Sequence, residues 1–302
     1  MNNAIIIQSL SKSYGDVEAL KNISIDIKTG EIFGFIGSDG AGKTTLFRIL
    51  TSLMIPDHGT AEVIGFDVVK DYKELRKNLG YMPGQFSLYQ DLTVKENLNF
   101  FAGIFKTSIA ENYHLIEDIY KQIEPFKNRR AGKLSGGMKQ KLALSCALIH
   151  KPKVLFLDEP TTGVDVVSRA EFWEILKSLK QQGITIVVST PYMDEAALCD
   201  RVALIQKGAI LTIDTPENIV SNFHEPIYAV KAENRHKLFE DISKFEATKS
   251  AYWFGENMHW IPKENFDEKS LENYFNMLNY NNIYIQKISA SIEDVFMELM
   301  IK

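Results

Sequence analysis

The sequence predicts an α/β protein in which helices cover a largely parallel sheet, with a small α+β domain after it. Three observations predict this: a glycine-rich loop between an apolar strand and a helix, a strand, helix, strand alternation over 153–190, and a second series of strands and helices after residue 224. At 302 residues the chain exceeds what one core usually holds. We therefore expect two domains, 1–223 and 224–302.

The elements of the first domain follow from apolar patterning. Alternating or continuous apolar residues between turn residues predict strands at 4–10, 17–27 and 31–37, before a helix at 42–53. Helical spacing over 95–105, 112–123 and 136–149 predicts a helical subdomain at about 86–150. Apolar runs at 154–158 and 185–189 flank a helix at 169–183, which is typical of a parallel sheet. Thr215 and Pro216 suit the start of a closing helix.

The second domain has its own order of elements. The pattern predicts strands at 227–232, 251–255, 258–262 and 283–289, and helices at 236–245, 269–278 and 291–300. The order βαββαβ with an added helix is typical of a ferredoxin-like domain. Its aromatic side chains are expected in the core rather than in a ligand site: Trp253, Trp260, Tyr280 and Tyr284.

Composition excludes several classes of protein. A formal charge of −5 and a pI near 5.8 give no overall basic surface for nucleic acid, so no nucleic-acid partner is expected. No secretion signal and no apolar run of about 18 residues is present, which predicts a cytoplasmic protein. Cys146 and Cys199 are far apart and fit no metal spacing, so we expect two small buried side chains.

Residues 37–44, GSDGAGKT, match the phosphate-binding pattern G-x-x-x-x-G-K-[ST] between a predicted strand and a predicted helix. Glycines let backbone amides surround a phosphate at a helix N-terminus. Lys43 would reach the β- and γ-phosphates of ATP, and the Thr44 hydroxyl would bind Mg²⁺. The predicted nucleotide-binding residues here are Gly37, Ser38, Asp39, Gly40, Ala41, Gly42, Lys43, Thr44 and Thr45.

A second motif, KVLFLDEPTTGVD at 153–165, is an apolar strand that ends in two acids. Asp158 is positioned to hold Mg²⁺ through water, and Glu159 to orient or deprotonate the attacking water. By itself the pair is equally compatible with a solvated acidic turn. The upstream glycine-rich loop favours ATP hydrolysis with Glu159 as the catalytic residue.

The third motif is LSGGMKQKL at 134–142. Ser135 is a helix N-cap, and the two glycines leave amides bare at a second phosphate-binding surface. With the three motifs in this order, the first two thirds of the chain resemble the nucleotide-binding subunit of an ABC transporter. The resemblance implies a P-loop NTPase fold of ABC-ATPase type with an N-terminal antiparallel β part. It also implies a head-to-tail dimer in which Ser135, Gly136 and Gly137 bind ATP held by the other subunit.

The resemblance assigns two further residues and shows two departures. Tyr14 stands where the family stacks an aromatic ring on adenine, and Asp165 lies in the loop that links the two active sites. The family's metal-sensing glutamine is replaced by Gly84, so Gln85, one place later, is our candidate catalytic and metal-contacting residue. Where the family has a γ-phosphate-contacting histidine, this chain has Pro191, which has neither an imidazole nor a backbone donor.

We therefore expect an ATPase that powers a membrane exporter of drug-like or lipid-like cargo. The expected partners are a second ATPase subunit, in a homodimer or heterodimer, and separate transmembrane permease subunits on whose inner face the chain docks. Phe86, Leu88 and Tyr89 suit a groove for a permease helix, although ordinary packing explains them almost as well. Two alternatives stay open: a non-transport ATPase acting on ribosomes or DNA, and a degenerate regulatory ATP-binding subunit of a heterodimer.

Overall fold

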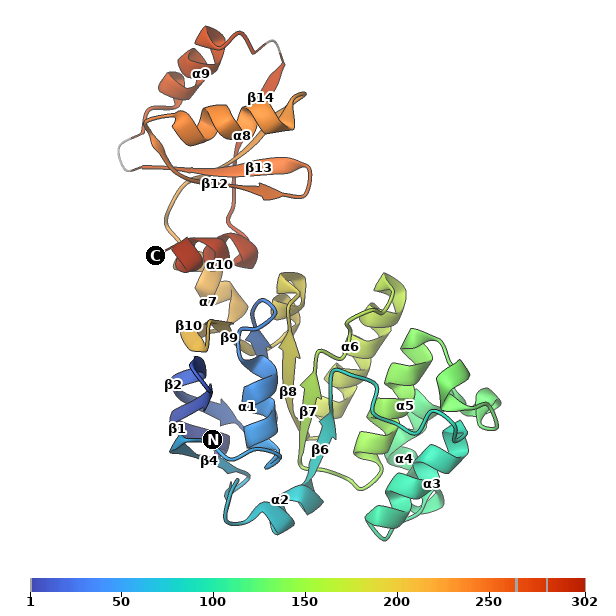
Figure 1. Ribbon diagram of the computed structural model, residues 1–302. Coiled ribbons are helices and arrows are strands. Elements are labelled where there is room, and N and C mark those ends of the chain that lie inside the picture. Colours follow the sequence, from blue (N-terminus) through green and yellow to red (C-terminus); the bar gives the residue numbers. More distant parts are fainter. Residues whose placement is uncertain (1, 264–265, 281, 302) are drawn as a thin grey trace. The chain divides into compact units, whose positions relative to one another are not determined.

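The computed structural model describes residues 2–263, 266–280 and 282–301. The chain forms two compact units, Met1–Pro216 and Glu217–Lys302 (Figure 1). The sequence placed the boundary slightly later, between residues 223 and 224, and the short helix α7 (Pro216–Ser221) occupies this region. Within the described residues, no helix has both the length and the apolar character needed to span a membrane.

The first unit is built on a six-stranded sheet. Its strand order is β10-β9-β3-β8-β7-β6, parallel throughout except for the β9–β10 pair. Every residue of β3, β7 and β8 is buried, because helices cover both faces of a parallel sheet. The bounds are β3 Ile32–Ile36, β6 Leu79–Met82, β7 Val154–Asp158, β8 Thr185–Thr190, β9 Arg201–Gln206 and β10 Ala209–Asp214.

A second, antiparallel sheet has the order β2-β1-β4-β5. Helix α1 (Lys43–Leu50) packs between the two sheets: its Phe47 ring lies 6.0 Å from Phe35 of β3 and 5.6 Å from Phe156 of β7, in one core with Ile5 of β1. This core fixes the glycine-rich loop at the end of β3. The bounds are β1 Asn3–Tyr14, β2 Val17–Lys28, β4 His58–Val63 and β5 Phe66–Asp67.

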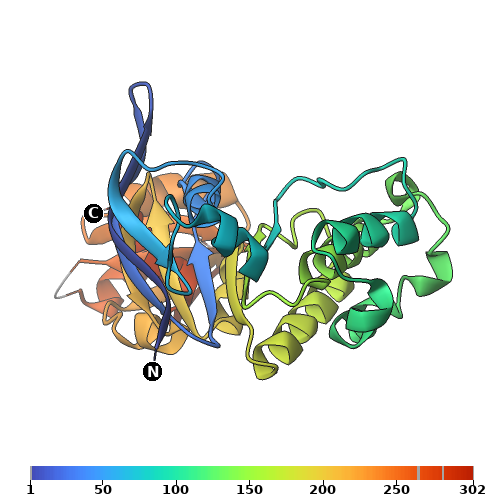
Figure 2. The same cartoon turned by 90° about the horizontal axis from the view of Figure 1, so that it is seen from below.

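The predicted helical subdomain is confirmed as a separate group of helices. Figure 2 shows them, in green, gathered to one side of the two sheets. Side-chain caps begin each helix: Thr93 for α3 and Ser108 for α4, both in capping boxes, and Ser135 for α5. The remaining bounds in this unit are α2 Tyr72–Asn78, α3 Val94–Ile104, α4 Ile109–Tyr120, η1 Glu124–Phe126, η2 Ala131–Lys133, α5 Gly136–Leu148, α6 Val166–Gln181 and η3 Met193–Leu198.

The second unit has the predicted ferredoxin-like order of elements. Its antiparallel sheet runs β12-β13-β11-β14. Leu238 of α8 and Phe275 of α9 pack with Trp260 in one core, while Met297 of α10 lies against a smaller cluster that contains Ile261. The bounds are β11 Ile227–Ala232, α8 Arg235–Lys244, β12 Thr248–Phe254, β13 Asn257–Pro262, α9 Glu268–Met277, β14 Ile283–Ile288 and α10 Ile292–Ile301.

The expectation that four aromatic residues lie in this core is only partly right. Trp260 is fully buried, and Trp253 and Tyr280 pack against the same cluster. Tyr284, however, is 51% exposed. On strand β14 its neighbours Ile283 and Ile285 pack against the core, so Tyr284, which lies between them, points to the opposite face of the sheet.

Buried polar contacts join α10 to the sheet. The Asp294 carboxylate accepts hydrogen bonds from the Tyr252 hydroxyl at 3.0 Å and from the Ser291 amide at 2.7 Å, and it lies 2.6 Å from Nδ1 of His259. Burial would raise the pKa of Asp294, but the hydrogen bonds from His259 and Ser291 outweigh this effect and leave the pKa below its ordinary value. The helix is therefore fastened by charge as well as by apolar packing.

Candidate functional site

The glycine-rich loop lies at the carboxyl end of β3, where parallel sheets bind ligands. The residues lining its pocket, of about 180 Å³, include Gly40, Gly42 and Lys43 of the loop and Glu159 from the end of β7. Gly40 and Gly42 have φ of +76° and +104°. In the described part of the chain, the amides of Asp39, Gly40 and Gly42 donate to no protein group. Bare amides at a helix start favour an anion.

Lys43 is held inside this loop. Its Nζ donates to the carbonyl oxygens of Gly37 at 2.8 Å and Ser38 at 3.1 Å. The same nitrogen lies 3.3 Å from a carboxylate oxygen of Glu159. The side chain is only 3% exposed, so its charge is directed into the pocket rather than into bulk solvent. An incoming phosphate would compete with Glu159 for this ammonium group.

The two acids lie at the end of β7 in different environments. Asp158 is 2% exposed, and its Oδ1 accepts a hydrogen bond of 2.5 Å from the Ser189 hydroxyl on the neighbouring strand β8. Burial, and next the charge of Asp158, raise the pKa of Tyr81 to about 12. Glu159 is only partly buried and faces the loop. The buried acid suits metal binding and the more exposed acid suits contact with water.

The donor set fits Mg²⁺, which prefers oxygen ligands. The Thr44 hydroxyl lines the pocket, and the Asp158 carboxylate ends the strand beside it. These are two of the three residues that the sequence assigned to the metal, and Gln85 is the third. Their contribution remains a prediction.

Gly84, rather than Gln85, lies against the two acids. A Cβ atom added to Gly84 would be 3.1 Å from the Asp158 carbonyl oxygen and 3.7 Å from Cβ of Glu159. Gln85 is exposed, and its side chain makes no hydrogen bond within the described residues. The role assigned to Gln85 stays a prediction that no contact in the structure supports.

Strand β8 ends at Thr190, directly before Pro191. The Thr190 carbonyl accepts from the Gly37 amide at 3.3 Å, and its hydroxyl accepts from the Tyr192 amide at 3.1 Å. The strand end is thus tied to the glycine-rich loop through backbone groups. Pro191 adds no side-chain hydrogen bond there, as its chemistry dictates.

The LSGG motif lies apart from the glycine-rich loop. Ser135 caps α5 by accepting from the Met138 amide at 3.4 Å. A Cβ on Gly137 would come within 2.9 Å of the Ser168 hydroxyl, so α5 packs closely on the start of α6. In Figure 1, β7, β8 and α6 separate α5 from α1. The loop and the LSGG motif of one chain therefore do not share a pocket, and the exposed Ser135 and Gly136 are free to meet another molecule.

The roles that the sequence assigned to Asp165 and Tyr14 stay predictions. Asp165 caps α6 by accepting from the Ser168 amide at 3.0 Å, which lowers the pKa of its carboxyl group. Tyr14 ends β1 with its ring 45% exposed. Its hydroxyl lies 3.4 Å from Oγ1 of Thr45, the last residue of the predicted phosphate-binding segment. The Tyr14 hydroxyl also donates to the sulfur of Met54 at 3.1 Å, and Tyr14 itself does not line the pocket of the loop.

An apolar groove of about 280 Å³ lies between β6 and the helical subdomain. Of the three residues that the sequence proposed for such a groove, only Leu88 lines it. Tyr89 instead packs its ring edge-on against Phe100, with centroids 4.8 Å apart, and Phe86 lies under the Lys139 ammonium. The walls are formed by residues that the sequence did not single out, including Phe101, Phe105 and His150.

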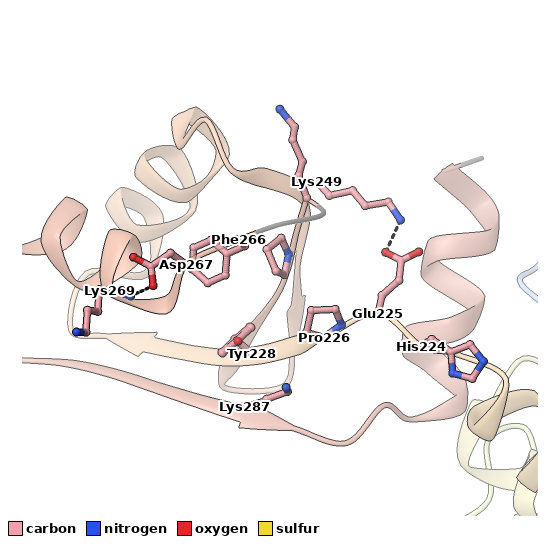
Figure 3. Close-up of a pocket in the computed structure, with 11 residues that line it drawn as sticks. His224, Glu225, Pro226, Tyr228, Lys249, Phe266, Asp267, Lys269 and Lys287 are labelled. Carbon is pink, nitrogen blue, oxygen red and sulfur yellow. Dashed lines mark hydrogen bonds and ion pairs between the residues drawn. The ribbon is translucent and has the colours of Figure 1, made fainter.

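The second unit has a pocket of its own, of about 1040 Å³, shown in Figure 3. Tyr228 and Phe266 line it, and Lys249, which also lines it, forms an ion pair with Glu225. Positive and negative side chains both line it, so the pocket offers no single ligand chemistry. No sequence motif predicted it.

The comparisons with known proteins agree with the geometry of the first unit. A protein-family model described as "ABC transporter" matches residues 20–162. The ABC transporter ATP-binding protein NatA of Bacillus subtilis is 40% identical over 199 residues, which cover 65% of this chain and 81% of NatA. This chain belongs to the ABC transporter ATP-binding family.

Two further relatives extend the comparison. The probable multidrug ABC transporter ATP-binding protein YbhF of Escherichia coli is 37% identical over 307 residues, covering 99% of this ABC ATP-binding protein. The chain spans about half of YbhF, 53% of its length. A solved dimer of the ATP-binding cassette MJ0796, bound to ADP and Pi, has a TM-score of 0.63 and 27% identity over 70% of this chain and 98% of the cassette.

One residue of the site was missed by the sequence reasoning. The sequence assigned Ser189 no role, yet its hydroxyl contacts the carboxylate of Asp158, the last residue of β7, and the backbone amide of Glu159, the residue after it. A usable signal was present: β7 and β8 flank a single helix, which is typical of neighbouring parallel strands, and residues at equal distances from the starts of the two strands then lie side by side. The structure pairs Asp158 with Ser189 in this way.

Proposed function

We propose that this ABC ATP-binding protein binds ATP with Mg²⁺ and hydrolyses it to power a membrane exporter. One observation carries the proposal: the loop lysine and the strand-end acid meet in one pocket, with Lys43 Nζ 3.3 Å from Glu159. Phosphoryl transfer needs a cation on the phosphates and a carboxylate near the attacking water. This pocket brings both groups to the same place.

Each residue of the pocket has a proposed task. The amides of the loop bind the phosphates, and Lys43 shifts from Glu159 to the β- and γ-phosphates when ATP enters. Glu159, released from the lysine, orients the attacking water and accepts its proton. Thr44 and Asp158 would hold Mg²⁺, which supplies charge neutralisation between the β- and γ-phosphates.

A second subunit completes the ATP site in this proposal. Ser135 and Gly137 lie away from the loop of their own chain, which leaves the bare helix start of α5 to bind ATP held by a partner. The dimeric MJ0796 cassette supports this arrangement, because it is similar in fold over 98% of its length.

The apolar groove beside β6 is the proposed docking site for a helix of a transmembrane permease. Leu88, Phe101 and Phe105 offer apolar surface next to Gly84, which touches the backbone of Asp158. A helix seated there is placed to sense changes at the acids. The chain would then lie on the inner face of the membrane. Export rather than import is supported by the multidrug name of the E. coli relative YbhF.

The test is ATPase activity of the purified chain, alone and with membrane vesicles that contain the permease. We expect turnover that the vesicles stimulate and that Glu159→Gln reduces at least about a hundredfold, with ATP binding retained. Stimulation by ribosomes or DNA in place of vesicles would support the non-transport alternative. No turnover under any condition would contradict the proposal.

Pro191 favours a second candidate, in which the chain works in a heterodimer. Its LSGG motif would then complete a fully active site on the partner, while its own loop forms the weaker site. Light scattering of the ATP-loaded Glu159→Gln protein separates the two: a dimer of the chain alone supports the homodimer. A monomer that dimerises only with a second ATP-binding subunit supports the heterodimer.

A further inference from the structure

The end of β8 lies between the two halves of the nucleotide site. On one side it pairs with β3, which leads into the glycine-rich loop, and on the other with β7, which ends in the acids. Ser189 is the last residue but one of β8 and is fully buried. A fully buried hydroxyl contacts no solvent, so the role of Ser189 follows from the protein groups to which it is hydrogen-bonded.

Those partners are both acids of the site. The Ser189 hydroxyl donates its single proton to Oδ1 of Asp158, at 2.5 Å, and accepts the Glu159 amide proton, at 3.1 Å. The Glu159 amide also lies 3.0 Å from the Ser189 carbonyl oxygen. The Ser189 hydroxyl therefore donates to the Asp158 carboxylate and accepts from the backbone amide of Glu159.

Glu159 needs such a restraint because its backbone is unusual. Its φ is +49°, in the left-handed region that non-glycine residues rarely adopt. A residue there returns to ordinary dihedral angles unless neighbouring groups hold it. The Glu159 amide donates both of its hydrogen bonds to Ser189, one to the hydroxyl oxygen and one to the carbonyl oxygen.

We propose that Ser189 is a positioning residue for ATP hydrolysis: its hydroxyl fixes the rotation of the Asp158 carboxylate and holds the strained backbone that directs Glu159 toward Lys43. With Oδ1 engaged by Ser189, the other oxygen of Asp158 would be the one available to help hold Mg²⁺. The inference rests on the proposed ATPase function. It gives the end of β8 a role in the site although Pro191 stands where the family has a histidine. Ser189 transfers no proton to substrate and touches no reacting atom.

A matched control is available in Ser145 of α5. Ser145 is also fully buried, and its hydroxyl donates to the Lys141 carbonyl at 2.8 Å, far from the acids. Ser145→Ala removes a buried hydroxyl of the same kind without touching the site. Ser189→Thr keeps the hydroxyl and adds one methyl group, so it tests whether the hydroxyl, and not the side chain's size, carries the effect.

The experiment measures five quantities on the full chain. They are kcat and KM for ATP, the Mg²⁺ concentration for half-maximal binding of a fluorescent ATP analogue, the affinity for that analogue without metal, and Tm. Ser189→Ala should lower kcat roughly tenfold to a hundredfold, the factor expected from losing a hydrogen bond to a charged group. It should also raise the Mg²⁺ requirement, while metal-free binding stays within about twofold because the glycine-rich loop is intact. Ser189→Thr should restore most of kcat.

Three results would overturn the proposal. The first is a Ser189→Ala protein whose kcat and Mg²⁺ requirement match wild type. The second is a loss of metal-free binding and Tm in parallel with kcat, since that indicates general unfolding rather than positioning. The third is an equal loss of kcat in Ser145→Ala. An inactive wild-type chain would instead contradict the proposed function, and the Mg²⁺ dependence of analogue binding would still test Ser189.

Discussion

Single alanine substitutions at the loop glycines can separate two costs of adding a Cβ atom. One cost is a clash with a neighbouring group, and the other is a positive φ that residues with a Cβ rarely adopt. A Cβ on Gly37 would lie 2.1 Å from the Ile205 carbonyl oxygen, although no positive φ is involved. A Cβ on Gly40 meets nothing within 4 Å, but φ is +76°. Gly42 combines both problems, with φ of +104° and a Cβ 2.4 Å from the Ala19 carbonyl oxygen.

These differences give graded magnitudes. Gly40→Ala should lower the free energy of unfolding by about 1–2 kcal/mol, the cost of left-handed backbone for a residue with Cβ. Gly37→Ala should cost about 1–3 kcal/mol through overpacking. Gly42→Ala should cost about 2–5 kcal/mol, the sum of the two. For a unit of this size each kcal/mol lowers Tm by roughly 2–4 °C.

The assay pairs Tm with affinity for ATP. Gly183→Ala is the control, because Gly183 follows α6 with φ of +87° and open space around its Cβ. It should lower Tm as much as Gly40→Ala but leave ATP affinity unchanged, whereas Gly42→Ala should weaken ATP binding at least about tenfold. If Gly40→Ala proved as destabilising as Gly42→Ala, the steric part of the reasoning would be refuted.

Three other predictions concern the strand end, the groove and α10. Pro191→His should raise kcat for ATP roughly tenfold or more, because it restores a positioned polar group at the end of β8. Pro191→Ala should not raise kcat. Equal kcat values for the two variants would contradict the idea that the missing histidine contact limits turnover. Ser87 is exposed and lines the groove, so Ser87→Arg should abolish the stimulation of ATP turnover by permease vesicles and leave basal turnover unchanged. The control is Gln181→Arg at another exposed position, which should change neither the stimulation nor the basal turnover. Because the folded-state pKa of Asp294 is lowered, its stabilisation is present above its unfolded pKa of about 4 and is lost as the pH falls through the folded value. Asp294→Asn should therefore destabilise the second unit at pH 7, and the loss should shrink as the pH falls through the folded pKa of Asp294. Hydrogen exchange of the β12 and β13 amides in the full chain measures this loss, and a loss that does not change with pH would contradict the assignment.

Much of the fold was predictable because its signals are local. The apolar run of β7, the helical spacing of α5 and the Ser135 cap each depend on neighbouring residues only, and each element appears where the sequence places it. The order of elements in the second unit was likewise enough to predict its ferredoxin-like topology. The exposure of Tyr284 depends on which face of β14 is buried: the structure packs Ile283 and Ile285 into the core and leaves Tyr284, between them, on the other face.

The sequence alone determined the chemistry of this protein: a loop for phosphate, two acids at a strand end, and a proline where a histidine is expected. The tertiary structure decided how these parts meet. It brought Lys43 to Glu159, set Gly84 rather than Gln85 against the acids, and put Ser189 between Asp158 and the Glu159 amide. The physical reason is that strand neighbours in a parallel sheet come from distant parts of the chain, so contacts across it depend on register and not on sequence spacing.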